Sequence, residues 1–272
     1  MKKLLFIAMV CNIYADTIKP YSYQLDYGKE SAKKSEVGYG VYGSYSFNSF
    51  FMEYGLENLK KEYREKKSIT QNDITVVYNQ YLGKDVISRV GIHYINSGNK
   101  EIDKGKIFIL GAKKFENDSY DVGIDFYYSS YTNRDDITIM QFSPFFGFYF
   151  QSIYLPENLY FKSVYNIITP QKGLNISDNR YFNFSLSNIN GDYTTTLSIN
   201  AFGTEQFSVD KQGFFANTHK DEYENTLRLS LGYKINSNYS LKGEAKIFDF
   251  KDEDNHNQAI KTQYSLNLNI MF

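Results

Sequence analysis

The segment Tyr264-Ser265-Leu266-Asn267-Leu268-Asn269-Ile270-Met271-Phe272 closes the chain with alternating apolar and polar side chains and ends on an aromatic ring. Successive side chains of a β-strand point to opposite faces. The aromatic and aliphatic residues of this segment therefore project from one face, and its serine and asparagines project from the other. A strand of this kind has one face suited to lipid and one suited to water.

Alternating segments of the same kind recur along the chain, with turn residues between them. We predict fourteen strands, near residues 19–28, 36–47, 50–60, 69–81, 85–95, 105–116, 119–130, 137–152, 157–168, 179–190, 192–203, 223–235, 239–249 and 261–272. An even number of strands brings both ends of a closed barrel to the same side. Pro144 lies inside one predicted strand and requires either a bulge or an unpaired position. A hairpin lost or gained there would change the count to twelve or sixteen.

The connections between these segments alternate between short and long along most of the chain. The short ones are Asn48-Ser49, Leu82-Gly83-Lys84, Glu116-Asn117-Asp118, Gly191 and Asn236-Ser237-Asn238. The long ones lie near residues 29–35, 61–68, 96–104, 169–178, 204–222 and 250–260. Tight turns at the periplasmic rim and longer loops outside are typical of membrane barrels in bacteria.

The terminal Phe272, the alternating strands and the connections together resemble a bacterial outer-membrane β-barrel protein of the porin-like class, with no particular subfamily indicated. The resemblance implies an all-β fold, a membrane-spanning antiparallel up-and-down barrel. It also implies that Phe272 is a signal for the barrel-assembly machinery, and that outer-membrane lipid and lipopolysaccharide surround the protein. The short segment from Asp16 to Lys19 departs from siderophore receptors and fatty-acid transporters, in which a plug or hatch precedes the barrel.

The first residues are typical of a signal peptide. Met1-Lys2-Lys3 is basic, an apolar run follows as far as Val10, and Ala15 is a small residue before the expected cleavage site. We therefore predict a signal peptide at 1–15 and a single transmembrane barrel domain at 16–272, exported to the outer membrane of a Gram-negative bacterium.

The composition is consistent with this class of protein. The chain contains 26 Tyr and 22 Phe, no Trp, and has a mean hydropathy of −0.48. No apolar run in the mature chain approaches the roughly 18 residues of a membrane helix, because the alternation of a barrel strand disguises its apolar half. A net charge of −1 leaves no basic surplus for nucleic acid. Cys11 leaves with the signal peptide unless it is lipidated, and Val10 is larger than the residue that lipoprotein cleavage prefers.

One of the two alternating sets of side chains along the strands is apolar and is predicted to face lipid. Its members include Tyr39, Val41, Tyr45, Val122, Ile124, Phe126, Leu227, Leu229, Leu231, Leu241, Ala245 and Ile247. Aromatic pairs bracket three short turns, as expected at a membrane interface: Phe47 with Phe50, Phe115 with Tyr120, and Tyr233 with Tyr239. The alternative is a soluble β-sandwich in which these rings form the core, because alternation alone does not say which face points inward.

The opposite set of side chains is polar and is predicted to line a hydrated lumen, because dry burial of so many charges would cost several kcal/mol each. The candidate pore-lining residues are Glu53, Glu57, Asp73, Arg89, His93, Asp121, Asp125, Lys162, Arg228, Lys242, Glu244 and Lys246. The earlier strands carry mainly acids and the later ones mainly bases, with Arg89, His93, Glu224 and Glu244 as exceptions. Two interpretations follow: a transverse field between facing walls, or local ion pairs such as Glu244 with Arg228.

These features predict a monomeric passive channel for small hydrophilic solutes, with no cofactor, no metal and no catalytic residue. The alternative is a closed structural barrel that engages a surface partner through its loops near 204–222 and 250–260. An inward fold of the first loop, anchored by Phe207, Phe214 and Phe215, would either constrict or seal the lumen. A third hypothesis is an outer-membrane lipid hydrolase with His93 as its base, although the residues after His93 have the wrong spacing for the known phospholipase motif.

Overall fold

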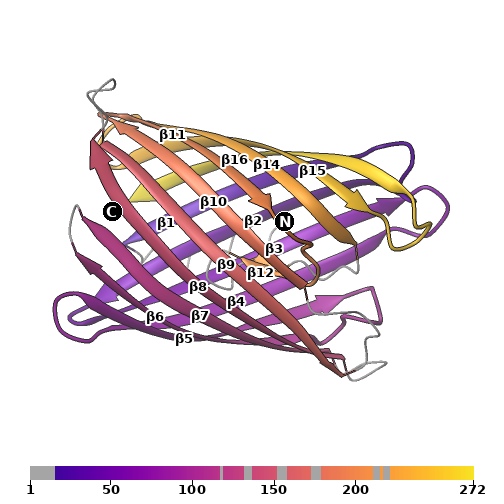
Figure 1. The fold of residues 1–272 in the computed structure, drawn as a ribbon, viewed down its shortest axis with the longest axis horizontal. Coiled ribbons are helices and arrows are strands. Elements are labelled where there is room, and N and C mark those ends of the chain that lie inside the picture. The colour runs from indigo at the N-terminus through magenta and orange to yellow at the C-terminus, as the bar shows by residue number, and fades with distance from the viewer. Residues whose placement is uncertain are drawn as a thin grey trace.

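The computed structural model describes residues 16–116, 119–131, 137–151, 158–172, 179–210, 215–216 and 221–272. Fourteen long strands close into one barrel, and two short strands form a separate hairpin (Figure 1). The barrel strands are β1 (Thr17–Tyr27), β2 (Lys33–Phe47), β3 (Phe50–Tyr63), β4 (Ile69–Tyr81), β5 (Val86–Ser97), β6 (Lys106–Glu116), β7 (Tyr120–Tyr131), β8 (Ile137–Gln151), β9 (Asn158–Lys172), β10 (Asn179–Asn190), β11 (Tyr193–Ala201), β14 (Glu222–Lys234), β15 (Tyr239–Lys251) and β16 (Gln258–Met271). The hairpin consists of β12 (Val209–Asp210) and β13 (Phe215–Ala216). The predicted all-β fold with fourteen barrel strands is confirmed, whereas the predicted signal peptide at 1–15 lies outside the described residues.

Each barrel strand pairs antiparallel with the barrel strands before and after it, and β1 closes the ring against β16. In the closing ladder Tyr23 lies opposite Ser265, and Tyr27 lies opposite Lys261. Both ends of the described chain meet at the rim of the short turns, where the Phe272 amide donates to the Asp16 carbonyl at 3.1 Å. Closure leaves no free edge in the sheet, as a sheet within lipid requires. No helix among the described residues is long and apolar enough to span a membrane.

The outer face of the barrel is apolar. Leu229, Leu231 and Ile247, for example, are 46%, 58% and 50% exposed. On the terminal strand, Tyr264 and Leu266 are also exposed, whereas the intervening Ser265 and its neighbour Asn267 line an interior cavity. The alternation of the closing segment therefore separates the two faces as expected.

Two residues depart from the face predicted for them. A β-bulge between Tyr223 and Asn225 interrupts the alternation in β14, because a bulge adds one residue to one strand of a pair. Glu224 is consequently exposed at the long-loop rim, where it accepts a hydrogen bond from Gln258 at 3.3 Å. Phe115 lies opposite Asp121 in the β6–β7 ladder and so shares its inner face, instead of joining an outer aromatic girdle.

Pro144 is accommodated within β8 without a bulge. On the β9 side the pairing passes from Phe142 with Ile167 directly to Phe145 with Val164. The register is the same before and after this gap. The missing amide proton of Pro144 therefore leaves a position unpaired without shifting the pairs around it. Both β8 and β9 remain complete, which excludes the counts of twelve and sixteen strands.

We expect an arginine to be tolerated on the inner face and not on the outer face of the same strand. Leu197 is 51% exposed at the centre of β11, whereas its neighbour Thr196 lines two interior cavities. Leu197→Arg should lower the free energy of unfolding in lipid vesicles by about 2–4 kcal/mol, the cost of an arginine at the bilayer midplane. The measurement is denaturant unfolding of protein refolded into vesicles.

The control for this experiment is Thr196→Arg, which adds the same charge one residue away. It should change the unfolding free energy by less than about 1 kcal/mol, because the inner cavities admit water. Equal losses in both variants would contradict the assignment of the two faces.

Candidate functional site in the barrel lumen

The described residues of the connection between β11 and β14, which include β12, fold into the barrel (Figure 1). Phe207 and Val209 are each 3% exposed and pack in one apolar cluster with the inner-face residues Tyr131 and Ile139. Gln141 on β8 holds the segment by a reciprocal pair of hydrogen bonds. Its Nε2 donates to the Val209 carbonyl at 2.9 Å, and its Oε1 accepts from the Val209 amide at 2.7 Å. The inward fold considered for this loop is therefore present.

Only one of the three aromatic anchors expected in this segment is described in full. Phe207 is in place, with its ring centroid 6.3 Å from that of Tyr131. Phe214 and the side chain of Phe215 lie outside the described residues. The apolar packing of Phe207 and Val209 narrows the lumen in the half of the barrel nearest to the long loops.

Aromatic rings also fill the same half of the barrel beside β1, β15 and β16. The Nζ atom of Lys261 lies 4.2 Å from the ring centroid of Tyr223 and 4.3 Å from that of Phe248. The rings of Tyr27 and Phe250 lie 5.7 and 5.9 Å away, and Lys261 donates a hydrogen bond to the Tyr223 hydroxyl at 2.8 Å. Aromatic faces stabilise a desolvated ammonium group. Side chains therefore occupy much of the interior near the long loops.

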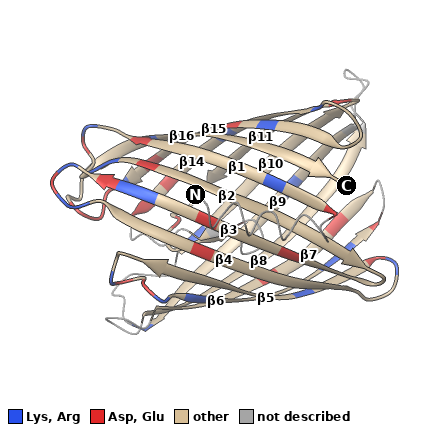
Figure 2. Cartoon of the chain, turned by 180° about the vertical axis from the view of Figure 1, so that it is seen from behind, with Lys and Arg blue, Asp and Glu red and all other residues tan. Residues whose placement is uncertain are grey.

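Two polar cavities open in the middle of the barrel and toward the short turns. The first has a volume of about 400 Å³, and its lining includes Lys19, Tyr21, Tyr23, Tyr42, Glu53, Glu57 and Asp73. The second has a volume of about 270 Å³, and its lining includes Arg89, Lys113, Asp125, Lys162, Asp210 and Arg228. Charged residues thus recur along the strands as well as at both rims (Figure 2). Seven of the predicted pore-lining residues border these two cavities: Glu53, Glu57, Asp73, Arg89, Asp125, Lys162 and Arg228.

The other predicted residues also lie on the inner wall. Asp121 is 4% exposed, and Glu244 and Lys246 are 9% and 6% exposed. Lys242 borders a further cavity near the short turns. His93 is buried between strands β4 and β6, and is 1% exposed.

Most charges around the second cavity have a partner of opposite sign. Lys113 contacts Asp121 at 2.9 Å, and Arg89 approaches Asp125 at 3.6 Å. On β15, Glu244 lies 3.3 Å from Lys246. The first pair joins neighbouring strands, the second crosses β6 at Gly111, and the third joins positions two apart on one strand. All three are local pairs as opposed to a field across the lumen.

The inward segment contributes one charge of its own to the second cavity. Asp210 lies 3.7 Å from Arg228 on β14. Arg228 thus faces a carboxylate carried by the segment that constricts the lumen. If this segment moved, the cavity would lose the carboxylate of Asp210 and Arg228 would lose its partner. The ion pair between Asp210 and Arg228 thus links the position of the segment to the charge of the cavity.

The surroundings of His93 do not match a lipid hydrolase that works at the outer surface. Its Nδ1 lies 2.7 Å from the Thr75 hydroxyl, and its Nε2 lies 3.7 Å from a carboxylate oxygen of Asp73. At 1% exposure, the imidazole has no access to the lipid-facing side of the barrel. Within the described part of the chain, no three His, Cys, Asp or Glu side chains gather to hold a metal ion.

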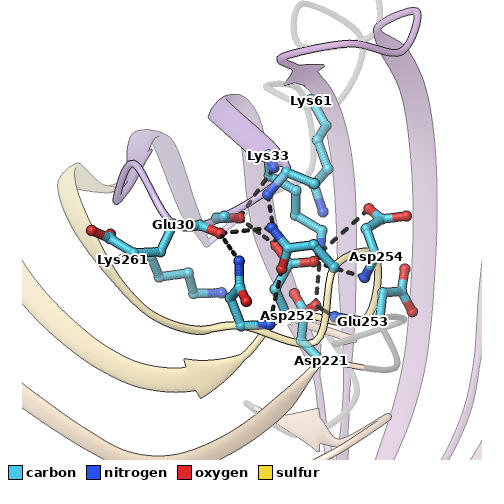
Figure 3. Close-up of polar contacts among 12 residues, drawn as sticks. Glu30, Lys33, Lys61, Asp221, Asp252, Glu253, Asp254 and Lys261 are labelled. Carbon is cyan, nitrogen blue, oxygen red and sulfur yellow. Dashed lines mark hydrogen bonds and ion pairs between the residues drawn. The ribbon is translucent and has the colours of Figure 1, made fainter.

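A buried ionic cluster ties three long loops together, and we term Lys33, Asp221, Asp252 and Asp254 the rim latch (Figure 3). The Lys33 Nζ atom lies 2.7 Å from Asp221, 3.5 Å from Asp252 and 3.9 Å from Asp254. The side chains of Lys33, Asp221 and Asp252 have no exposed surface. Asp221 ends the segment that folds into the lumen, so the rim latch fixes the point at which that segment returns to the barrel wall.

Hydrogen bonds keep Asp252 ionised within the rim latch. Burial alone would raise the pKa of the Asp252 carboxyl group. The hydrogen bond from Ser31, the charge of Lys33 and the amides of Ala32 and Asp254 outweigh burial and hold this pKa below its ordinary value. The carboxylate is thus charged throughout the neutral range.

Sequence analysis missed the aromatic residues of the first cavity. Tyr21 and Tyr23 lie on the inner face of β1, although an alternating aromatic segment is ordinarily assigned to lipid. A sequence signal that could have revealed Tyr21 and Tyr23 is the pair Gly38 and Gly40 on β2. A Cβ atom at Gly38 would lie 2.1 Å from the Tyr23 ring, and one at Gly40 would lie 2.5 Å from the Tyr21 ring.

The sequence matches no protein-family profile and no curated protein. The fold is similar to solved bacterial outer-membrane barrels. The CymD monoaromatic hydrocarbon channel has a TM-score of 0.59 at 7% identity, over 97% of this chain and 91% of that one. The Pseudomonas putida toluene transporter TodX has a TM-score of 0.54 at 7% identity, over 93% and 88%. The NanC porin has a TM-score of 0.51 at 10% identity, over 93% and 100%. At these identities the likeness establishes the barrel fold.

We expect the rim latch to depend on its buried cation. Lys33→Met should lower the free energy of unfolding by about 3–5 kcal/mol, because it leaves buried carboxylates without their counter-charge. The neighbouring Lys34→Met is a matched control: Lys34 is 62% exposed and lies 3.8 Å from Glu62, itself 38% exposed. That variant should lose less than about 1 kcal/mol. Equal stabilities of the two variants in denaturant unfolding would contradict a stabilising role for Lys33.

The rim latch should also weaken in acid. Because the folded state lowers the pKa of Asp252, its contribution is complete above the unfolded carboxyl value of about 3.9 and is lost as the pH falls through the lower folded value. Protection factors for hydrogen exchange at residues 221 and 252–257, corrected for the intrinsic rate at each pH, should therefore stay constant from pH 7 to pH 5 and fall below about pH 4. Asp252→Asn should remove part of this pH dependence. A fall in protection already present near pH 6 would contradict the lowered pKa.

Proposed function

We propose that the protein is a passive outer-membrane channel for small hydrophilic solutes, narrowed by the segment between β11 and β14. The observation that carries the proposal is the pair of polar cavities inside a closed barrel whose outer face is apolar. A wall with this many charged side chains favours water over a dry core, because unhydrated charges are costly unless each is paired.

The size of the barrel is compatible with a modest aqueous path. Fourteen strands lie between eight-stranded barrels, which side chains can fill, and sixteen-stranded porins, which leave an open channel. The twelve predicted pore-lining residues belong to this proposal, and Arg228 lies beside the constriction, 3.7 Å from Asp210.

The proposal also places partners around the barrel. Lipid and the inner part of lipopolysaccharide would contact the apolar outer belt, to which Leu229 and Ile247 belong. The exposed terminal ring of Phe272 would be available to the barrel-assembly machinery during insertion. The proposal assigns no catalytic role to His93, whose neighbours Thr75 and Asp73 leave it buried in the wall.

The decisive experiment is the single-channel conductance of the refolded protein in a planar bilayer. Discrete ohmic steps, smaller than those of an open sixteen-stranded porin, would support a constricted channel. Silence from protein whose folding is shown by heat-modifiable gel mobility would overturn the proposal. It would favour a sealed barrel that acts through its outer loops.

The constriction should widen when its attachment to β8 is cut. Gln141→Ala removes both hydrogen bonds to Val209, so the inward segment should leave the lumen part of the time and the mean conductance should rise at least twofold. The control is Gln171→Ala, because Gln171 is exposed near the same rim and its one hydrogen bond to a described residue goes to the Thr169 carbonyl. A conductance of Gln141→Ala identical to that of both wild type and control would show that this segment does not limit the current.

A further inference from the structure

The carboxylates of the first cavity differ from those of the second in lacking a strong counter-charge. Within the described residues, neither Glu53 nor Glu57 forms an ion pair with a lysine or arginine. Glu53 instead accepts hydrogen bonds from the Tyr42 hydroxyl and from the Asn79 amide, the latter at 2.8 Å. Neutral donors fix the direction of a carboxylate but leave its charge uncancelled.

Glu57 is held by two tyrosines that reach across a strand. The hydroxyls of Tyr21 and Tyr23 donate to its two oxygens at 2.6 and 3.1 Å. Both tyrosines are on β1 and Glu57 is on β3, so their rings cross β2 over Gly40 and Gly38. Because a Cβ at either glycine would collide with a ring, the two glycines permit this arrangement. The carboxylate is therefore positioned by three adjacent strands.

Asp73 provides an oxygen without a hydrogen bond to any described residue. It lies opposite Glu57 in the β3–β4 ladder, so the two side chains share the inner face. Its Oδ2 accepts from Gln71 at 2.8 Å, whereas its Oδ1 is buried and has no hydrogen-bond partner among the described residues. Asp73 is only 6% exposed. A buried carboxylate oxygen without a partner is costly, and a ligand with several donors would remove that cost.

Lys19, the single lysine among the described residues that line this cavity, lies toward Glu53. Lys19 interacts electrostatically with Glu53, and its Nζ lies 5.1 Å from the Tyr42 ring centroid. Near Asp73, the basic group within ion-pair distance is the imidazole of His93, at 3.7 Å. The space between Glu57 and Asp73 is thus the most electronegative part of the cavity.

We propose that this cavity binds a small primary ammonium solute between Glu57 and Asp73. The ammonium group has three donors, enough to reach the free Oδ1 of Asp73 and an oxygen of Glu57 together. Tyr21 and Tyr23 also border the cavity, and aromatic rings attract a cation. The volume of about 400 Å³ accommodates such a solute with some water. This inference deepens the proposed channel function by naming a class of solute.

The test measures equilibrium binding to the refolded full chain in detergent, by titration calorimetry, independently of any current. Ethanolammonium is the probe, ethylene glycol its neutral analogue and glycolate its anionic analogue. Ethanolammonium should bind, and the glycol and glycolate should bind at least tenfold more weakly. Equal binding of ethanolammonium and the glycol, or tighter binding of glycolate, would overturn the proposal.

The variants Glu57→Gln and Asp73→Asn should each weaken ethanolammonium binding about tenfold, which corresponds to about 1.4 kcal/mol. Both keep the size of the side chain, and gel mobility on heating reports whether each variant is folded. Glu224→Gln is the matched control: it removes one negative charge from the exposed rim and should leave binding unchanged. Undiminished binding in folded Glu57→Gln and Asp73→Asn would also overturn the site.

Conductance of the same preparations separates this inference from the proposed channel. A conducting protein that does not bind ethanolammonium would retain the channel function and lose the site. A protein that binds ethanolammonium without conducting would retain the site and lose the channel. In a conducting protein that binds the probe, ethanolammonium should reduce the open-channel current of wild type and Glu224→Gln more than that of Glu57→Gln.

Discussion

The closing ladder between β1 and β16 is the interaction on which the rest of the structure depends. Within lipid no water is available to satisfy an exposed strand edge, so a sheet must return to its first strand. Thr17 pairs with Met271 and Tyr27 with Lys261, which joins the two ends of the chain over the full length of β1. Once the ring is closed, each side chain on a barrel strand points either to the lipid or to the interior. The apolar outer belt and the polar inner wall are two consequences of that one closure.

Closure creates an interior, and the chain fills its two halves differently. Near the long loops, Phe207 and Val209 pack against the wall, and rings surround Lys261. Away from them, the interior keeps polar cavities. The difference arises because the long loops have enough chain to fold back inside, and the rim latch at Asp221 anchors the segment that carries Phe207 and Val209. A barrel interior built this way is narrow near the long loops and keeps cavities lined by polar side chains toward the short turns.

Alternation predicted the strands well because each strand is amphipathic over its whole membrane-spanning length. The ranges 69–81 and 179–190 coincide with β4 and β10. Alternation failed to predict the face of Glu224, because a β-bulge displaces this residue and no local sequence pattern reveals the bulge. Several strands also extend past their predicted ends at the long-loop rim, as β9 does to Lys172. Outside the bilayer a strand needs hydrogen-bonded neighbours but not an apolar face, so its sequence no longer alternates.

The charges of the lumen show a further limit of sequence reasoning. Sorting residues by sign along the strands left two interpretations open, a transverse field and local ion pairs, because pairing depends on the stagger between strands. In the folded barrel Asp121 and Asp125 lie beside cations, whereas Glu57 is held by tyrosine hydroxyls. Similar carboxylates on the same inner wall thus differ in how much charge they present. Selectivity in such a lumen follows the charges that remain uncompensated, which neither the net charge of −1 nor the count of acids on a strand reveals.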